Sequence, residues 1–479
     1  MLFSSIEFAI FFPIVFVLYW FACGKKYQLQ NILLLIASYY FYSCWNWHFL
    51  FLLIFSTGLD YFTGLKMSGA TNKREKQIWF WLSVCVNLGF LGVFKYYNFF
   101  IDSFADLLSA FGLKANLATL QVILPVGISF YTFHGLSYVF DIYNDRIKPE
   151  RNFVHYSVFV CFFPLLVAGP IERATHLLPQ ITRARTFDYS KAVDGLRQIL
   201  WGLFKKIVIA DTCASVVNPI FEHYHAQSAS NLLLGAVLFA FQIYCDFSGY
   251  SDIALGTARI LGIELLRNFG FPYFSRDIAE FWRRWHISLT TWFRDYLYIP
   301  LGGSHGSKWL SIRNTFIIFL VSGFWHGANW TFIFWGAFHA ALFMPLLIFG
   351  RNRLHTNIVA EGKLLPTIKE LIQMLITFLL VVIGWIFFRA SSISDAFGYI
   401  ISLFSHSIFT LPTHKISTLS VYILILLFIE WIQRERKHGL SQIESIIKFK
   451  SLRWGIYILM IISIIQFGGK TETFIYFQF

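Results

Sequence analysis

The chain of 479 residues is 57% hydrophobic and only 14% charged, with a mean hydropathy of +0.59. A soluble domain carries roughly 25% charged residues, so this composition excludes an ordinary soluble enzyme and indicates a membrane protein. The net charge of +13 is explained by basic cytoplasmic loops, as the positive-inside rule requires, and we do not expect nucleic-acid binding.

Apolar runs that approach the roughly 20 residues of a membrane-spanning helix recur along the chain. In chain order they are 8–21, 78–94, 232–244, 317–349 (interrupted at His326), 371–388, 421–431 and 454–467. Membrane barrels alternate apolar and polar residues and these runs do not, so we expect an all-α polytopic protein. By length we expect about 11 transmembrane helices, together with re-entrant and interfacial helices.

The sequence shows no soluble domain, low-complexity linker or fixed-period repeat, and we expect one membrane domain over residues 1–479. Residues 1–120 and 351–479 predict outer packing helices, the latter ending in an aromatic tail. Residues 121–350 predict a catalytic core, because Gly, Pro and charged residues break the apolar segments there. Broken backbone at membrane depth is tolerated only where protein or a water-filled cavity surrounds it. This part should therefore line a cavity.

The basic residues of the loops predict how the chain is oriented in the membrane. Basic residues cluster in short loops, which we place in the cytoplasm, and the two chain ends then lie outside. Residues 1–10 have no basic start or small-residue cleavage site, so we do not expect a cleaved signal peptide. The six cysteines include no CxxC pair, and we expect neither a disulfide framework nor a metal site.

The stretch FWRRWHISLTTWFRDYLYIPLGG, residues 281–303, combines aromatic and basic residues. At 3.6 residues per turn it predicts one helix that Pro300 ends, with Arg283, Arg284 and Arg294 around its polar face. The aromatic face carries Trp282, Trp285, His286, Leu289, Trp292, Phe293 and Tyr296. The helix is either an interfacial anchor or a site where these arginines also bind an anionic cofactor, since guanidinium binds phosphate bidentately.

Two histidines, His286 and His326, lie in broken aromatic segments, and the stretch SGFWHGANW surrounds His326. A lone buried histidine is often a hydrogen-bonded structural residue, but ionisable groups within a membrane are costly and indicate function. Burial disfavours the imidazolium, so we expect a neutral His326. A neutral imidazole can take a proton from a hydroxyl as a general base.

The stretch QIYCDFSGYSDIALG, residues 242–256, places Asp246 and Asp252 in an apolar segment. Carboxylates at membrane depth need partners, and we expect these two to have a structural pairing. The candidate partners are Arg283, Arg284 and Arg294. The Gly- and Pro-containing stretches PVGISFYTF and VAGPIER are interpreted as cavity linings or re-entrant turns.

The stretch 281–303, followed by SGFWHGANW, resembles the membrane-bound O-acyltransferases, the MBOAT family. The segments LPVGISFYTF, AGPIER, YCDFSGYSDIA and FIYFQF also resemble its branch of bacterial polysaccharide O-acetylation proteins, the alginate O-acetylase membrane-subunit branch. The resemblance runs in order over nearly the whole chain. It implies a ring of transmembrane helices around a central tunnel, with re-entrant helices at its centre.

The resemblance also implies the chemistry. His326 matches the catalytic histidine and His286 a second family histidine, and Trp325 and Asn329 are near enough in sequence to support the site. The donor substrate would be cytoplasmic acetyl-CoA, with no permanently bound cofactor. Acetyl would cross the tunnel to a periplasmic or extracellular SGNH-hydrolase-like partner that O-acetylates a cell-envelope or secreted polysaccharide. We expect the protein in the bacterial inner membrane.

Several alternatives stay open. The tail TFIYFQF, residues 473–479, is either an aromatic anchor at the membrane surface or, by analogy with relatives, carries the acyl group on Tyr476 or docks the partner. The donor could be an acyl carrier protein, as in teichoic-acid D-alanylation. Outside the family, a transporter or flippase would use the same polar residues as a substrate path, although the sequence shows no paired inverted halves. The acceptor polysaccharide is not identified.

Overall fold

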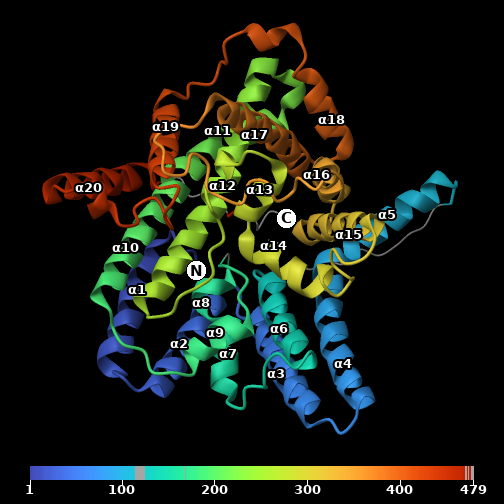
Figure 1. Cartoon of the computed structure of the whole chain (residues 1–479), viewed down its shortest axis with the longest axis vertical. Helices are drawn as coiled ribbons and strands as arrows, with labels where there is room; N and C mark the ends of the chain where they lie inside the picture. The colour runs from blue at the N-terminus through green and yellow to red at the C-terminus, as the bar shows by residue number, and fades with distance from the viewer. Residues whose placement is uncertain (114–123, 168, 470–471, 473, 476–479) are drawn as a thin grey trace. The chain divides into compact units, whose positions relative to one another are not determined.

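The computed structural model describes residues 1–113, 124–167, 169–469, 472, 474 and 475. Every regular element in this described part of the chain is a helix (Figure 1), which confirms the all-α prediction. Among the described residues, six helices are long and apolar enough to cross a membrane: His48–Gly69, Lys73–Ala110, Ala229–Ile260, Trp330–Ile348, Ile368–Arg389 and Lys450–Phe467. Two shorter apolar helices are Ile6–Ala22 and Ser417–Ile432. The protein is therefore a multi-pass membrane protein.

The long apolar helices are fewer than the roughly 11 expected by length, because some apolar runs form shorter or divided helices. The run 317–349 is divided at His326, between helices α15 (Lys308–His326) and α16 (Trp330–Ile348). The run 8–21 is shared between α1 (Ile6–Val17) and a π-helical turn. A long apolar stretch in the sequence is therefore not always one complete crossing.

The chain forms two compact units. Unit 1 comprises Met1–Tyr189 and Ala258–Leu266, and unit 2 comprises Ser190–Thr257 and Arg267–Phe479. Residues 1–120 fall in unit 1, 351–479 fall in unit 2, and 121–350 are divided between the two. The single membrane domain with these three segments stays a prediction. The candidate site residues that the structure describes all lie in unit 2.

Unit 1 is a helical bundle in which α3, α4 and α6 lie side by side (Figure 1). Its helices are α1 (Ile6–Val17), α2 (Tyr27–Ser43), α3 (His48–Gly69), α4 (Lys73–Leu91), α5 (Tyr97–Ala110), α6 (Ile128–Tyr143), α7 (Phe153–Cys161), α8 (Phe163–Leu166) and α9 (Ala174–Ile181). Buried Asp60 on α3 accepts hydrogen bonds from Ser83 Oγ (2.5 Å) and Asn87 Nδ2 (2.8 Å) on α4. These bonds offset the cost of a buried carboxyl group and join the two helices.

The two Gly- and Pro-containing stretches of unit 1 make structural contacts. PVGISFYTF leads into α6, whose residues 128–133 are all buried. In VAGPIER, the fully buried Glu172 accepts a hydrogen bond from the backbone N–H of Leu266 (2.6 Å), and its other carboxylate oxygen lies 2.8 Å from His176 Nδ1. Glu172 thus ties its own loop to the segment after α12, a packing role that the motif alone did not reveal.

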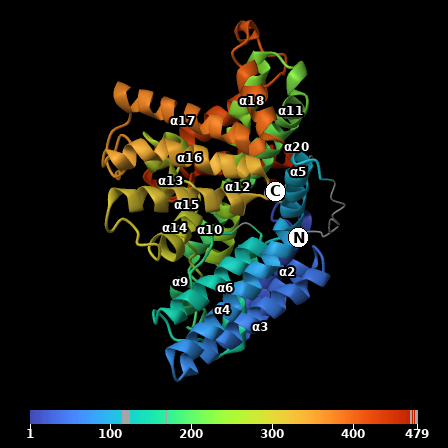
Figure 2. The same cartoon turned by 90° about the vertical axis from the view of Figure 1, so that its right-hand side faces the viewer.

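Unit 2 contains most of the remaining helices. They are α10 (Tyr189–Leu203), the π-helical η3 (Phe204–Ala210), α11 (Asp211–Glu222), α12 (Ala229–Ile260, whose last residues belong to unit 1), α13 (Ile278–Arg284), α14 (Ile287–Phe293), α15, α16, α17 (Ile368–Arg389), α18 (Ile393–Ser402), α19 (Ser417–Ile432) and α20 (Lys450–Phe467). Figure 2 shows α15, α16 and α17 stacked alongside one another.

Helices α15 and α16 pack with their backbones in close contact. A Cβ added at Gly323 would collide with the carbonyl oxygen of Phe332, and one added at Gly336 would collide with that of Phe319. Small residues at such crossings allow the close helix packing that is common in membranes. The glycines therefore fix the end of α15, where His326 lies, against α16.

Candidate active site

The segment around His286 breaks where one helix was predicted. Helix α13 ends at Arg284, Trp285 is extended, and α14 begins at Ile287. His286 itself has a left-handed backbone conformation with φ of +42°. This conformation is uncommon for a residue other than Gly and is often found at functional sites. The prediction of one continuous helix through His286 is therefore wrong.

Asn268 explains why the helix breaks at this point. Its backbone carbonyl accepts a hydrogen bond from the N–H of Ile287 (2.9 Å), so this N–H bonds outside the helix. Its Oδ1 accepts from Ser288 Oγ (2.6 Å) and lies 3.2 Å from His286 Nδ1, while its Nδ2 donates to Ser251 Oγ (3.1 Å). An amide oxygen can only accept, so this network assigns the ring proton to Nδ1 and the lone pair to Nε2.

His286 is buried among rings. Its ring centroid lies 4.6 Å from Phe247, 6.1 Å from Trp325 and 6.4 Å from His326. His286 lies outside the candidate membrane spans, and burial lowers the pKa of its imidazole to about 3. The imidazole is therefore neutral at physiological pH, with its basic Nε2 in the buried cluster.

His326 is the last residue of α15 and is only 3% exposed. Its ring centroid lies 5.0 Å from Trp325, 5.2 Å from Trp335 and 5.5 Å from Phe388. His326, which lies in an aromatic segment of the sequence, is thus surrounded by rings in the structure. His286, between α13 and α14, lies close to it, with ring centroids 6.4 Å apart.

Asn329 shapes the turn that follows His326. Its side-chain oxygen accepts a hydrogen bond from the N–H of Thr331 (3.0 Å), which caps the start of α16. Its Nδ2 donates to the carbonyl oxygen of Ser391 (3.2 Å), just beyond α17. Asn329 therefore holds the turn between α15 and α16, and so supports the position of His326.

The two carboxylates of α12 pair with lysines, and the prediction of arginine partners is wrong. Lys206 Nζ lies 2.8 Å from Asp246 Oδ1, and Lys205 Nζ lies 2.7 Å from Asp252 Oδ2. Both lysines belong to η3, which runs beside α12 because Gly202 and Gly249 permit a close approach of the two backbones. A Cβ at Gly202 would lie 2.6 Å from the carbonyl oxygen of Gly249. These lysines were missed because their basic run was interpreted as a cytoplasmic loop.

The three arginines proposed for cofactor binding make local bonds. Arg283 donates to the carbonyl oxygens of Asn352 and His355, both at 2.8 Å. Arg284 pairs with Glu280 at 2.7 Å, and Arg294 pairs with Asp295 at 2.8 Å. Their binding to an anionic cofactor stays a prediction.

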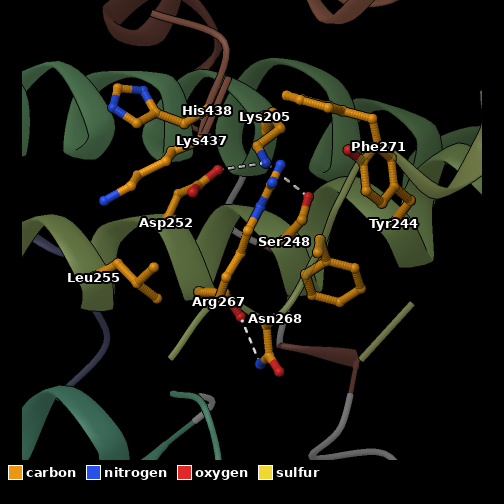
Figure 3. Close-up of a pocket in the computed structure, with 12 residues that line it drawn as sticks. Lys205, Tyr244, Ser248, Asp252, Leu255, Arg267, Asn268, Phe271, Lys437 and His438 are labelled. Atoms are coloured by element: carbon orange, nitrogen blue, oxygen red, sulfur yellow. Dashed lines mark hydrogen bonds and ion pairs between the residues drawn. The ribbon is translucent and has the colours of Figure 1, made fainter. Parts of the chain in front are cut away.

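A different set of cations lines a small pocket in unit 2 (Figure 3). Lys205, Arg267 and Lys437 line the pocket together with one carboxylate, Asp252, which pairs with Lys205. Arg267 extends across the pocket, and its Nε is buried without a hydrogen-bond partner in the described part of the chain. Asn268 also lines the pocket. The pocket is therefore positively charged and is connected to His286 through Asn268.

Two other residues, His339 and Tyr476, are relevant to the site. His339 on α16 is fully buried, with its ring centroid 5.0 Å from Trp335, which contacts His326. The sequence did not single out His339, because it lies in an uninterrupted apolar run with no glycine, proline or charged residue beside it to mark a site. Tyr476, the predicted acyl relay, lies outside the described residues.

Comparison with known proteins decides the family. A family model described as the membrane-bound O-acyltransferase family, MBOAT, matches residues 150–388. A probable alginate O-acetylase, AlgI, of Pseudomonas aeruginosa is 41% identical over 85% of this chain and 75% of that protein. The chain belongs to the membrane-bound O-acyltransferase family. The resemblance seen in the sequence is thereby confirmed, and the protein is an O-acyltransferase.

Other relatives of this chain differ in the substrates that their names state. The peptidoglycan O-acetyltransferase of Helicobacter pylori is 34% identical over 81% of this chain and 76% of that protein. The teichoic acid D-alanyltransferase of Bacillus subtilis is 30% identical, but over only 45% of this chain and 57% of that protein. The similarity to the O-acetylating relatives thus covers much more of the chain.

The contact between Asn268 and His286 yields a pH prediction. Replacing Asn268 with Asp places a carboxylate beside Nδ1, and an opposite charge at this distance raises a pKa by about one to three units. Because His286 would then be protonated at a higher pH, the acid limb of the acyl-transfer profile should move to higher pH. The pH dependence of transfer by the purified Asn268→Asp variant measures this shift.

The matched control is Ser288→Ala, which removes the other side-chain hydrogen bond to the same Oδ1 without adding charge. Its acid limb should coincide with that of the unsubstituted protein. An Asn268→Asp profile with an unmoved acid limb would show that protonation of His286 does not affect the reaction.

Proposed function

We propose that this chain moves an acetyl group from cytoplasmic acetyl-CoA across the bacterial inner membrane, for O-acetylation of a cell-envelope or secreted polysaccharide. The observation that carries the proposal is the pair His286 and His326, with ring centroids 6.4 Å apart in a buried aromatic enclosure. The relatives that overlap most of the chain are named as alginate and peptidoglycan O-acetylating proteins, which supports acetyl as the acyl group.

The proposed chemistry uses His326 as a general base. Its neutral imidazole takes the proton of an acceptor hydroxyl while the hydroxyl oxygen attacks the thioester carbonyl carbon. The carbon–sulfur bond then breaks, and the CoA thiolate takes the proton back from the imidazolium. The rings of Trp325, Trp335 and Phe388 around His326 exclude water, which protects the thioester from hydrolysis.

The donor enters, in this proposal, at the positively charged pocket. A phosphate group of the donor would pair with Arg267 and Lys437, because Lys205 is already neutralised by Asp252. Phosphate favours guanidinium and ammonium partners. Asn268 lines the pocket and contacts His286, so the proposal places the pantetheine arm beside Asn268, directed toward the two histidines.

The acetyl group leaves, in this proposal, to an SGNH-hydrolase-like partner on the far side of the membrane, which esterifies the sugar. A second route passes through the phenol of Tyr476, which would attack the thioester and then give up the acetyl group to the partner's hydroxyl. This route is favoured by the burial of Phe474 and Ile475, which immediately precede Tyr476 in the sequence.

The competing functions receive less support. A carrier-protein donor would follow the teichoic acid D-alanyltransferase, whose match covers 45% of the chain. A transporter or flippase would not need an acyl donor, whereas membership of an acyltransferase family calls for one. An acetyl-CoA-dependent reaction is therefore the function that we propose to test.

Replacing His326 with Gln removes the proposed base but keeps a polar side chain of similar length. General-base catalysis contributes about 10²–10⁴-fold, so transfer of radiolabelled acetyl from acetyl-CoA should fall by that factor. His339→Gln is the matched control, since His339 is equally buried among rings but has no proposed role, and it should keep most of the activity. Full activity of the His326→Gln protein would show that His326 is not the general base. A transporter would release no CoA from acetyl-CoA, with or without this substitution.

The pocket prediction separates donor binding from chemistry. Arg267→Met and Lys437→Met each remove a charge-assisted bond worth roughly 1.5–3 kcal/mol, so the KM for acetyl-CoA should rise about tenfold or more with kcat nearly unchanged. Lys448→Met, an exposed lysine that does not line the pocket, should leave KM unaltered. If an acylated carrier protein is the donor, the same two variants should raise the KM for the carrier. An unchanged KM for both donors would show that neither donor binds in this pocket.

The relay route is tested by replacing Tyr476 with Phe, which keeps the ring and removes the hydroxyl. Incubation with radiolabelled acetyl-CoA should leave a base-labile label on the C-terminal peptide of the unsubstituted chain and none on the variant. Acetyl transfer to the partner should fall to background in the variant. Transfer at the full rate without the hydroxyl would show that acetyl passes directly to the partner.

A further inference from the structure

A buried cluster of charges in unit 2 is not used by the proposed chemistry. Lys206 Nζ lies 2.6 Å from Asp211 Oδ1 and 2.8 Å from Asp246 Oδ1. The three side chains are only 2–3% exposed. One ammonium therefore faces two carboxylates, and the cluster has spare acceptor capacity when all three groups are ionised.

The C-terminal segment supplies groups that complete the cluster. The backbone N–H of Ile475 donates to Asp246 Oδ2 at 2.7 Å. Lys206 Nζ donates in turn to the carbonyl oxygen of Glu472 at 3.2 Å. Two backbone groups of the segment, three residues apart, are thus held by two side chains of the cluster.

Between these two bonds, Phe474 is fully buried. Its ring centroid lies 4.4 Å from Tyr250 and 6.2 Å from Phe247, and the ring of Phe247 lies 4.6 Å from that of His286. The segment therefore reaches the neighbourhood of His286 through a continuous series of aromatic contacts.

The neighbouring ion pair shows that anchoring η3 to α12 does not require the tail. Lys205 and Asp252 join the same two elements at 2.7 Å, and Lys205 donates its other bond to Ser248 Oγ at 2.8 Å. By contrast, the cluster of Lys206 binds backbone groups of the tail itself. This difference distinguishes a tail anchor from a purely helix-packing ion pair.

We propose that Lys206 and Asp246 form a latch that seats the C-terminal segment beside His286, and that both are positioning residues for acyl transfer. The role in transfer rests on the proposed function, whereas the seating of the tail does not. Loss of the latch frees the tail while the histidines and the donor pocket keep their own contacts. It therefore lowers kcat for transfer to the partner and leaves the KM for acetyl-CoA unchanged.

The experiment measures access to the tail in the full-length chain, without donor or acceptor. Carboxypeptidase digestion followed by intact mass gives the rate at which Ile475 and Phe474 are released. Lys206→Met should release them at least tenfold faster than the unsubstituted protein. Lys205→Met is the matched control, because it breaks the adjacent buried pair on the same elements, and it should release them at the unsubstituted rate.

Two milder variants keep the test decisive if Lys206→Met does not fold. Asp246→Asn preserves shape and removes only the charge that faces Ile475 and Lys206, so release should again be faster. Asp211→Asn retains both bonds to the tail, so release should be slow. Equal release from Asp246→Asn, Asp211→Asn and the unsubstituted chain would overturn the latch. So would equally fast release from Lys205→Met and Lys206→Met, and neither result would affect the test of His326.

Discussion

The cost of burying charge organises unit 2. An unpaired ion in an apolar interior is destabilised by several kcal/mol, so each buried lysine of η3 requires a carboxylate within reach. Asp246 and Asp252 meet this requirement on α12. Two residues between these aspartates on α12 make contacts at the site. Phe247 contacts the ring of His286, and Ser251 accepts a hydrogen bond from Asn268. The two ion pairs therefore flank the stretch of α12 that contacts His286 and Asn268.

The aromatic enclosure solves a different problem. A base that removes a proton from a hydroxyl must be neutral, and a thioester must be kept from water. Large rings serve both requirements, because they fill the space around His326 and leave it only 3% exposed. In His286 a specific ring nitrogen is the base, because Asn268 sets the tautomer through Nδ1 and leaves Nε2 as the basic atom. Ring packing thus keeps His326 from solvent, and one amide sets the tautomer of His286.

The sequence predicted the helical class and the family, because these depend on composition and on short motifs. It did not predict the break at His286, since the stretch 281–299 has helical periodicity and contains neither Gly nor Pro. A bond from distant Asn268 overrides that local preference. The prediction of the partners of Asp246 and Asp252 was wrong for a similar reason. Which cation reaches a carboxylate depends on the close approach of Gly202 and Gly249, which no local pattern encodes.

Two separate contacts now converge on His286, and they have different consequences. The donor pocket reaches it through Asn268, whose amide lines the pocket and bonds the imidazole. The tail reaches it through Phe247, by ring contact alone. A polar contact can change the electronic state of the imidazole, whereas a ring contact can change only its position. A disturbance on the pocket side should therefore alter the pH dependence or donor affinity, and one on the tail side should alter the rate of transfer at saturating donor.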